Sequence, residues 1–382
     1  MKVTERKSNF ELLRILSILL IISFHSVFKS GYQIYTLSLN NYLIKVCYFF
    51  GELGVNLFIL ITGYFMITEK MSIKRVILLI TETFFYNLLN VLLNYFIAGK
   101  EILILDVLFP VILGKYWFVT AYIVLYILSP YLNILIKNLK KVEHLKLIIL
   151  LVSIWCIIPT IFGLTKGTSE TLLNYTRLVW FIIIYFIGAY IRLYDIKIIN
   201  KLKNRLIIIF LMTSIMLLSI PIIYKYRVFF NSLGTIEWAY LWTPNNVFML
   251  ILSICLFYSF LKLDIKSIKI INIIASTTLG IYMLHDGLFY DYMWNGLFNA
   301  KINLAGPNPL LFIIIVTGII FVVGVIIDLI RQFIEKYTIK KLLYSKRINK
   351  ILFFIKSHWQ WINYYLILIY VKLRSKYVRK GI

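Results

Sequence analysis

Two residues of the first apolar segment, Arg14 and His25, carry side chains that can do chemistry. Eleven residues separate them, which on an α-helix corresponds to a rotation of about 1100°, close to three full turns, and a rise of about 16 Å. If residues 9–28 form a helix, both side chains therefore point into one groove. A guanidinium binds phosphates, and an imidazole can act as a base near neutral pH. The pattern predicts a groove with an anion-binding group at one end and a titratable base deeper inside.

Each of the two residues also has an ordinary structural interpretation. Arg14 can be an anchor whose long side chain reaches the membrane surface, and His25 can be a histidine hydrogen-bonded to a neighbouring helix. Ionisable residues inside a membrane span are costly to bury, however, and commonly mark a functional pathway. Their shared face therefore favours a functional role for both.

The segments that must position these residues are long and apolar. The chain has 382 residues, of which 61% are hydrophobic and 15% charged, and its mean hydropathy is +0.87. Many runs approach ~20 residues with almost no charge, the length that a helix needs to cross the ~30 Å hydrocarbon core. We predict an all-α, polytopic transmembrane helical bundle with about ten spans, at 9–28, 44–67, 76–97, 116–136, 145–164, 178–194, 206–224, 246–262, 270–292 and 309–330.

One apolar segment, residues 102–114, is too short to be a span. It contains Asp106 and Pro110, so we expect it to be re-entrant or to lie at the membrane interface.

The distribution of positive charge gives the spans an orientation. Of the 41 Lys and Arg residues, 31 fall on the side of the N-terminus and nine on the other side, while Arg14 lies inside the first span. Cytoplasmic loops carry the excess of Lys and Arg, so both termini are predicted to be cytoplasmic. The net charge of +25 therefore indicates contact with membrane lipid, and no nucleic acid is expected as a partner.

We divide the chain into a membrane domain, residues 1–331, and a basic, aromatic-rich tail, residues 332–382. Residues 351–371 of the tail could form an eleventh span, but that span would bury Lys356 and His358. A cytoplasmic or interfacial helix lying on the inner leaflet fits this composition better.

Further candidate residues lie in other spans. Glu52 and Asn56 are one turn apart in the second span, where Glu52 can either lie in water at the outer interface or face His25 or an acceptor hydroxyl. The remaining candidates, which helix packing or an interfacial aromatic belt would also explain, are Tyr116, Trp117, Tyr282 and His285.

No metal site is expected. The three cysteines, Cys47, Cys156 and Cys255, all fall inside apolar runs, and their odd number argues against a disulfide framework. Phosphate-binding loops, nucleophile elbows and zinc motifs are not found in the sequence.

Four motifs together resemble the acyltransferase family 3 of integral-membrane acyltransferases. The first is the pair Arg14 and His25, with ten residues between them. Three more segments follow in the order that the family has them: "GVNLFILITGY" (54–64), "YWFVTAYIVLYILSP" (116–130) and "STTLGIYMLH" (276–285). Each motif is weak alone, but the ordered set is specific and brackets residues 9 to about 330.

The resemblance implies a ten-helix bundle in the bacterial plasma membrane. Such a protein transfers an acyl group, often acetyl, from cytoplasmic acyl-CoA to a carbohydrate on the outer side, with the glycan as acceptor. Arg14, helped by Lys74 and Arg75, would hold the phosphates of the donor; the family often has two arginines, spaced by two residues, near this point.

In this scheme His25 would act as general base on the attacking sugar hydroxyl, or alternatively carry the acyl group itself. Tyr116, Trp117 or Asn56 would donate hydrogen bonds to the oxyanion, and the sequence does not rank them.

Other classes of membrane protein compete with this interpretation. A transporter or flippase of a lipid-linked glycan also uses buried charges and glycine-broken helices, but we find no inverted repeat between the two halves. A polysaccharide polymerase would be expected to have a large external loop rich in arginine, and the external loops here are short. A non-enzymatic scaffold would not need Arg14 and His25 on one helical face. The sequence leaves open the acceptor, the acyl chain and the oligomeric state.

Overall fold

The computed structural model of the chain describes residues 7–34, 36–102, 104–162, 176–226, 228 and 243–350. Within these ranges the structure consists of helices joined by turns, without strands, as the sequence predicts. The predicted tail helix at 351–371 lies outside the described residues. The helices of the first half are α1 (Ser8–Phe28), α2 (Leu39–Met66), α3 (Ile73–Phe96), α4 (Ile104–Leu108), α5 (Trp117–Asn138), α6 (Lys141–Val152), the π-helix η1 (Ser153–Ile157) and α7 (Ile158–Phe162).

The second half begins with α8 (Arg177–Leu193), which follows the first gap in the description. The helices after it are α9 (Lys197–Asn200), α10 (Leu202–Lys225), α12 (Val247–Leu261), α13 (Lys269–Ala275), α14 (Thr278–Asp286), the π-helix η2 (Tyr292–Leu297), α15 (Ala300–Ala305), α16 (Pro309–Tyr337) and α17 (Ile339–Leu343). By compactness the chain divides into two units, Met1–Asp328 and Leu329–Ile382.

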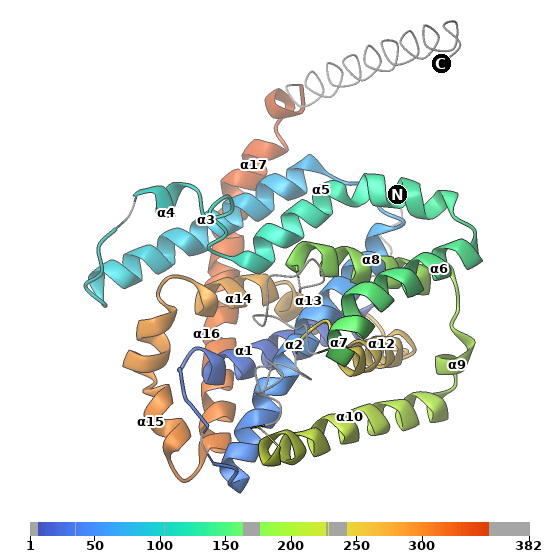
Figure 1. Cartoon of the computed structure of the whole chain (residues 1–382). Helices are drawn as coiled ribbons and strands as arrows, with labels where there is room; N and C mark the ends of the chain where they lie inside the picture. The colour runs from blue at the N-terminus through green and yellow to red at the C-terminus, as the bar shows by residue number, and fades with distance from the viewer. Residues whose placement is uncertain are drawn as a thin grey trace, which may run out of the picture. The chain divides into compact units, whose positions relative to one another are not determined.

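The first unit is built around α1 and α2. These two helices pack along each other, α2 also packs against α8 and α12, and α1 packs against α12, α13, α14 and α15 (Figure 1). Glycines permit the closest approaches: a Cβ on Gly54 would come within 2.5 Å of the Ser17 carbonyl of α1, and one on Gly63 within 2.4 Å of the Tyr185 carbonyl of α8. Small residues at helix crossings are typical of membrane bundles.

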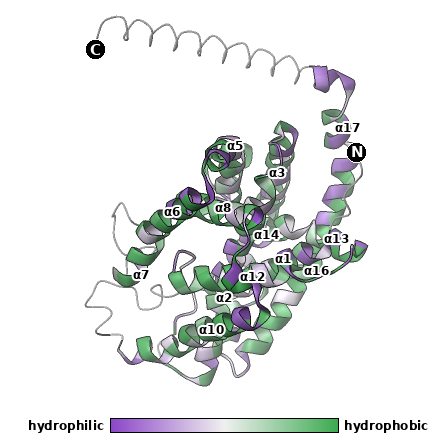
Figure 2. Ribbon diagram, turned by 90° about the vertical axis from the view of Figure 1, so that its right-hand side faces the viewer, coloured by the Kyte–Doolittle hydropathy of each residue, from purple (hydrophilic) through white to green (hydrophobic). Residues whose placement is uncertain are grey.

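Seven of the described helices are long and apolar enough to cross a membrane. Hydrophobic residues predominate along them (Figure 2), and on α10 the side chains of Phe210 and Leu218 are 70% and 63% exposed, as expected for a surface that faces lipid. The seven spans are Ser8–Phe28, Leu39–Met66, Ile73–Phe96, Trp117–Asn138, Lys141–Ile161, Leu202–Lys225 and Pro309–Leu343. The chain is therefore a multi-pass helical membrane protein.

The predicted number of about ten spans is not reached in the described part of the chain. The apolar helix α12 has 15 residues and is shorter than the predicted span at 246–262, whereas α8 has the same 17 residues as the predicted span at 178–194. The predicted span at 270–292 is broken into α13 and α14 at Ser276 and Thr277. The orientation of the two termini remains a prediction.

Three successive hydroxyl residues lie at the break between α13 and α14. Ser276, Thr277 and Thr278 each donate a hydrogen bond to the carbonyl three residues earlier, at 2.7, 2.7 and 3.0 Å. At the same point the main-chain amides of Ser276 and Thr277 donate to carbonyls three residues earlier, which tightens the chain into a turn. The break allows α14 to begin anew, and α14 carries three of the residues described below.

Candidate functional site

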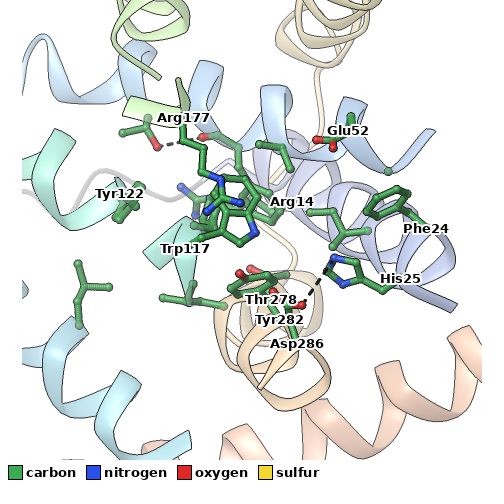
Figure 3. Close-up of a pocket in the computed structure, with 18 of the residues that line it drawn as sticks. Arg14, Phe24, His25, Glu52, Trp117, Tyr122, Arg177, Thr278, Tyr282 and Asp286 are labelled. Atoms are coloured by element: carbon green, nitrogen blue, oxygen red, sulfur yellow. Dashed lines mark hydrogen bonds and ion pairs between the residues drawn. The ribbon is translucent and has the colours of Figure 1, made fainter. Parts of the chain in front are cut away.

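A cavity of about 500 Å³ lies between the helices of the first unit (Figure 3). Its walls come from α1, α2, α3, α5, α8 and the α13–α14 region. Both Arg14 and His25 line it, as their spacing on one helical face predicts. Four cations among the lining residues outnumber the two carboxylates; the cations are Arg14, Lys29, Arg75 and Arg177, and the carboxylates are Glu52 and Asp286. This excess of positive charge favours an anionic ligand.

His25 lies at one part of this cavity and is only 6% exposed. Its Nδ1 lies 3.0 Å from Nε2 of His285, which is fully buried. Its Nε2 faces the carboxylate of Asp286 at 4.0 Å (Figure 3). This separation is too long for a direct hydrogen bond, but close enough for a charge on the imidazole to interact with the carboxylate.

Asp286 also forms an ion pair with Lys29, the residue that directly follows α1. Its Oδ1 lies 2.7 Å from Nζ of Lys29, and that ammonium is 4.2 Å from the centre of the Tyr290 ring. Lys29 follows His25 by four residues, so the two side chains lie one turn apart on the same face of the chain. Three ionisable side chains therefore lie together in this part of the cavity: His25, Lys29 and Asp286.

Two of the arginines that line the cavity, Arg14 and Arg75, are paired with a carboxylate. Nη1 of Arg14 lies 3.1 Å from the carboxylate of Glu11, and the Arg14 side chain keeps 24% of its surface exposed. Arg75 is 3.5 Å from Glu69, with its guanidinium 5.7 Å from the centre of the Tyr126 ring. The Arg75–Glu69 pair is about half exposed and contributes little to stability, so Arg75 can exchange its partner at small cost. Glu11 is only 3% exposed, so breaking its pair with Arg14 would be costly.

Lys74, the third residue predicted to hold the donor, does not line the cavity, although its neighbour Arg75 does. Consecutive residues of a helix point about 100° apart, so the two side chains at the start of α3 cannot share one direction. The structure brings Arg14 and Arg75 to the cavity together and leaves Lys74 outside it.

The two aromatic candidates at the start of α5 differ in their exposure to the cavity. Trp117 lines it, and the guanidinium of Arg177 stacks over the indole at 4.5 Å from its centre. Tyr116 is fully buried behind the cavity wall, where its hydroxyl accepts a hydrogen bond from Nδ2 of Asn90 at 3.3 Å. Trp117 is therefore the residue of this pair that a ligand could contact directly.

The two candidates from α14 lie close to the base. Tyr282 lines the cavity, with its ring centre 6.4 Å from that of His25. His285 does not line it but contacts His25 directly. The role of both residues as supporting groups remains a prediction.

The two candidates of α2 are separated by the structure. Glu52 lines the cavity, but Asn56 does not. Nδ2 of Asn56 donates to the Pro244 carbonyl at 2.9 Å, and its Oδ1 accepts from the Trp180 indole at 2.9 Å. A step of four residues turns a helix by about 40° beyond a full turn, which carries Asn56 away from Glu52 toward α8 and α12. Its amide is engaged in joining helices, so it is not positioned to bind an oxyanion in the cavity.

Three charged residues that line this site were not predicted as candidates: Lys29, Arg177 and Asp286. Lys29 and Arg177 are among the nine positive residues that the charge distribution assigns to the side opposite the N-terminus. The four-residue step from His25 to Lys29 was the one signal that could have found the first of them. Arg177 and Asp286 reach the site only through tertiary packing.

The fold and this site define a multi-pass membrane protein with a base and anion-binding groups in a cavity between its helices. Residues 7–329 match the family model of the acyltransferase family 3, which is described as an acyltransferase domain. Because the match spans nearly the whole chain, the protein belongs to this family and is a membrane acyltransferase, as the four motifs predicted. Neither a search of curated proteins nor a search of solved structures finds a significant match.

Proposed function

We propose that this protein is an O-acyltransferase that moves an acyl group, most simply acetyl, from cytoplasmic acyl-CoA to a hydroxyl of a cell-surface or exported polysaccharide. The observation that carries this proposal is the cavity that presents His25 and the cations Arg14 and Arg75 to one ligand within a chain of the acyltransferase family. The membrane is proposed to be the bacterial plasma membrane, and the acceptor a glycan or lipid-linked glycan.

The donor would bind with its phosphates at Arg14 and Arg75. Both arginine side chains are partly exposed, at 24% and 53%. Arg75 can exchange its present carboxylate for a phosphate, while Arg14 would keep its pair with the buried Glu11 and donate further charge-assisted hydrogen bonds to a phosphate. The narrow arm of the donor would then follow α1 toward His25. Because Arg14 and His25 are about 16 Å apart along one helix, the thioester of an extended arm would reach the base while the phosphates stay at the other end.

The chemistry would proceed by general base catalysis. Nε2 of His25 takes the proton of the acceptor hydroxyl, and the hydroxyl oxygen attacks the thioester carbonyl carbon. The resulting oxyanion collapses, the carbon–sulfur bond breaks, and the thiolate leaves with the proton that His25 holds. The products are the acylated glycan and free CoA, and His25 returns to its neutral form.

Other lining residues suit the acceptor and the charges that develop. The carboxylate of Asp286, 4.0 Å from Nε2, would stabilise the imidazolium that forms. The indole of Trp117 offers an apolar face for a sugar ring, with Arg177 available as a donor to hydroxyl or anionic groups beside it. Glu52, on the α2 wall, would accept a hydrogen bond from a second hydroxyl of the acceptor.

A comparison of cell-surface glycans with and without the protein tests this function. The glycans are released and analysed by mass spectrometry from cells that express the chain, from cells that lack it, and from cells that express the His25→Ala variant at the same level. We expect one acyl mass per repeating unit to be present only with the intact chain. Glycans of identical composition in all three cells would overturn the proposal, and a failure of the glycan to reach the surface without the protein would indicate a transporter or flippase instead.

A further inference from the structure

His285 is a buried imidazole whose hydrogen bonds determine where its proton lies. Its side chain is fully buried, and its ring lies beside those of Tyr282 and Trp294, with centres 6.2 and 6.3 Å away. Nδ1 lies 2.6 Å from the main-chain carbonyl of Ile281, one turn earlier in α14. A carbonyl oxygen can only accept a hydrogen bond, so Nδ1 of His285 carries a proton.

The second nitrogen of His285 must then accept. A fully buried imidazole that packs against aromatic rings is most stable in its neutral form, because burying its charge is costly. Neutral imidazole has only one protonated nitrogen, so Nε2 of His285 carries no proton and presents a lone pair that can accept a hydrogen bond. That lone pair lies 3.0 Å from Nδ1 of His25, and the hydrogen bond between the rings requires the proton on Nδ1 of His25.

From this chain of hydrogen bonds we infer that His285 is a positioning residue that holds His25 in the tautomer with its proton on Nδ1 and its lone pair on Nε2. The inference deepens the proposed function and rests on it in one respect, namely that His25 is the base of the acyl transfer. It assigns the basic nitrogen of His25 to the side of the ring that faces Asp286.

The assignment has a consequence for proton transfer. When Nε2 of His25 takes up a proton, Nδ1 keeps its own proton and continues to donate to His285, so the inter-ring bond serves both protonation states. Imidazole in water prefers the proton on Nε2, which would place it on the nitrogen that has to accept. His285 therefore opposes the intrinsic preference of the ring, in the way that a hydrogen-bonding partner fixes the tautomer of other catalytic histidines.

The tautomer can be measured directly by NMR, because the chain contains only four histidines. The full-length protein is prepared in lipid nanodiscs with ¹⁵N-labelled imidazole rings, and correlation spectra distinguish protonated from unprotonated ring nitrogens. We expect both His25 and His285 to carry their protons on Nδ1 in the intact chain, without any substrate present. A proton on Nε2 of His25 would overturn the inference.

Variants of His285 extend the test to function. His285→Phe keeps a ring but removes the acceptor, whereas the amide oxygen of His285→Gln can still accept from Nδ1 of His25. A matched control is His144→Phe, since His144 is equally buried among aromatic rings but does not line the cavity. We expect His285→Phe to shift His25 toward the Nε2-protonated form and to lower kcat about 100-fold, within the range that general base catalysis contributes.

The KM for acyl-CoA should stay within about twofold in His285→Phe, since the variant changes the base and not the donor site. His285→Gln should retain more of both the tautomer and the activity. A His285→Phe variant that lost activity while His25 kept its proton on Nδ1 would overturn the inference. The two hypotheses fail separately, because full activity of His25→Ala would refute the proposed base and leave the measured tautomer unaffected.

Discussion

The carboxylate of Asp286 is the group whose removal tests the electrostatics of the site most sharply. Its Oδ1 lies 4.0 Å from Nε2 of His25 and its side chain is 5% exposed, so little water screens the interaction. Asp286→Asn keeps the size of the side chain and removes its charge. We expect acyl transfer to slow because the imidazolium that His25 becomes in the transition state loses its nearest negative charge.

The size of the effect follows from the geometry. Two unit charges about 4 Å apart interact by about 4 kcal/mol at an effective dielectric constant near 20. Lys29 contacts the same carboxylate oxygen at 2.7 Å and offsets part of this attraction. If about half of the attraction between Asp286 and the imidazolium remains, Asp286→Asn raises the activation free energy by about 2 kcal/mol. This corresponds to a decrease of about 30-fold in kcat.

The assay needs a control for the cation that the substitution leaves behind. In Asp286→Asn the ammonium of Lys29, which is 19% exposed, loses its partner and can destabilise the protein. We therefore compare Asp286→Asn with the double variant Asp286→Asn/Lys29→Met, measuring transfer from radiolabelled acyl-CoA and the thermal midpoint of each. The double variant should regain the thermal midpoint but not kcat. A double variant with the kcat of the intact chain would refute the electrostatic role.

Three further predictions concern the base, the donor site and the packing. His25→Ala should lower kcat by about 10²- to 10⁴-fold while the protein still inserts and folds; near-normal acyl transfer by the purified variant would remove His25 as the base. Arg14→Ala should weaken acyl-CoA binding about tenfold in a calorimetric titration, whereas Arg192→Ala, a control outside the cavity, should not; equal affinities would remove Arg14 from the donor site. Gly63→Ala places a Cβ 2.4 Å from a backbone oxygen of α8 and should lower stability by about 1–3 kcal/mol. The matched control is Gly318→Ala, whose Cβ meets nothing within 4 Å, and equal thermal midpoints of the two variants would contradict the packing argument.

The part of the site that lies on a single helix could be predicted from the sequence. Helical geometry alone places Arg14 and His25 on one face, because their relation depends on no other part of the chain. Hydropathy likewise predicts the long spans, since each must satisfy its main-chain groups internally. The family resemblance rests on the same local patterns, and it is confirmed over residues 7–329.

The partners of the base could not be predicted in this way. Nδ1 of His25 contacts His285, 260 residues later in the chain, while the sequence offered Glu52 as one possible partner. The break before α14 is a turn in the main chain at Ser276 and Thr277, whereas hydropathy alone predicts one continuous span over the same stretch. The same holds for Asn56. Its position one turn from Glu52 could be predicted, but the hydrogen bonds of its amide with Pro244 and Trp180 could not.

The use of one helix for both ends of the site has a mechanical consequence. The residues of α1 and its C-terminal end that line the cavity extend from Arg14 to Lys29, a rise of about 22 Å at 1.5 Å per residue. At Gly54 the backbone of α2 packs closely against the Ser17 carbonyl in the middle of this helix. The distance between the anion-binding end and the base is therefore fixed by the helix itself. Adjustment of the site to a ligand would then come from the other walls, among them the α13–α14 region, which changes direction next to the residue that orients His25.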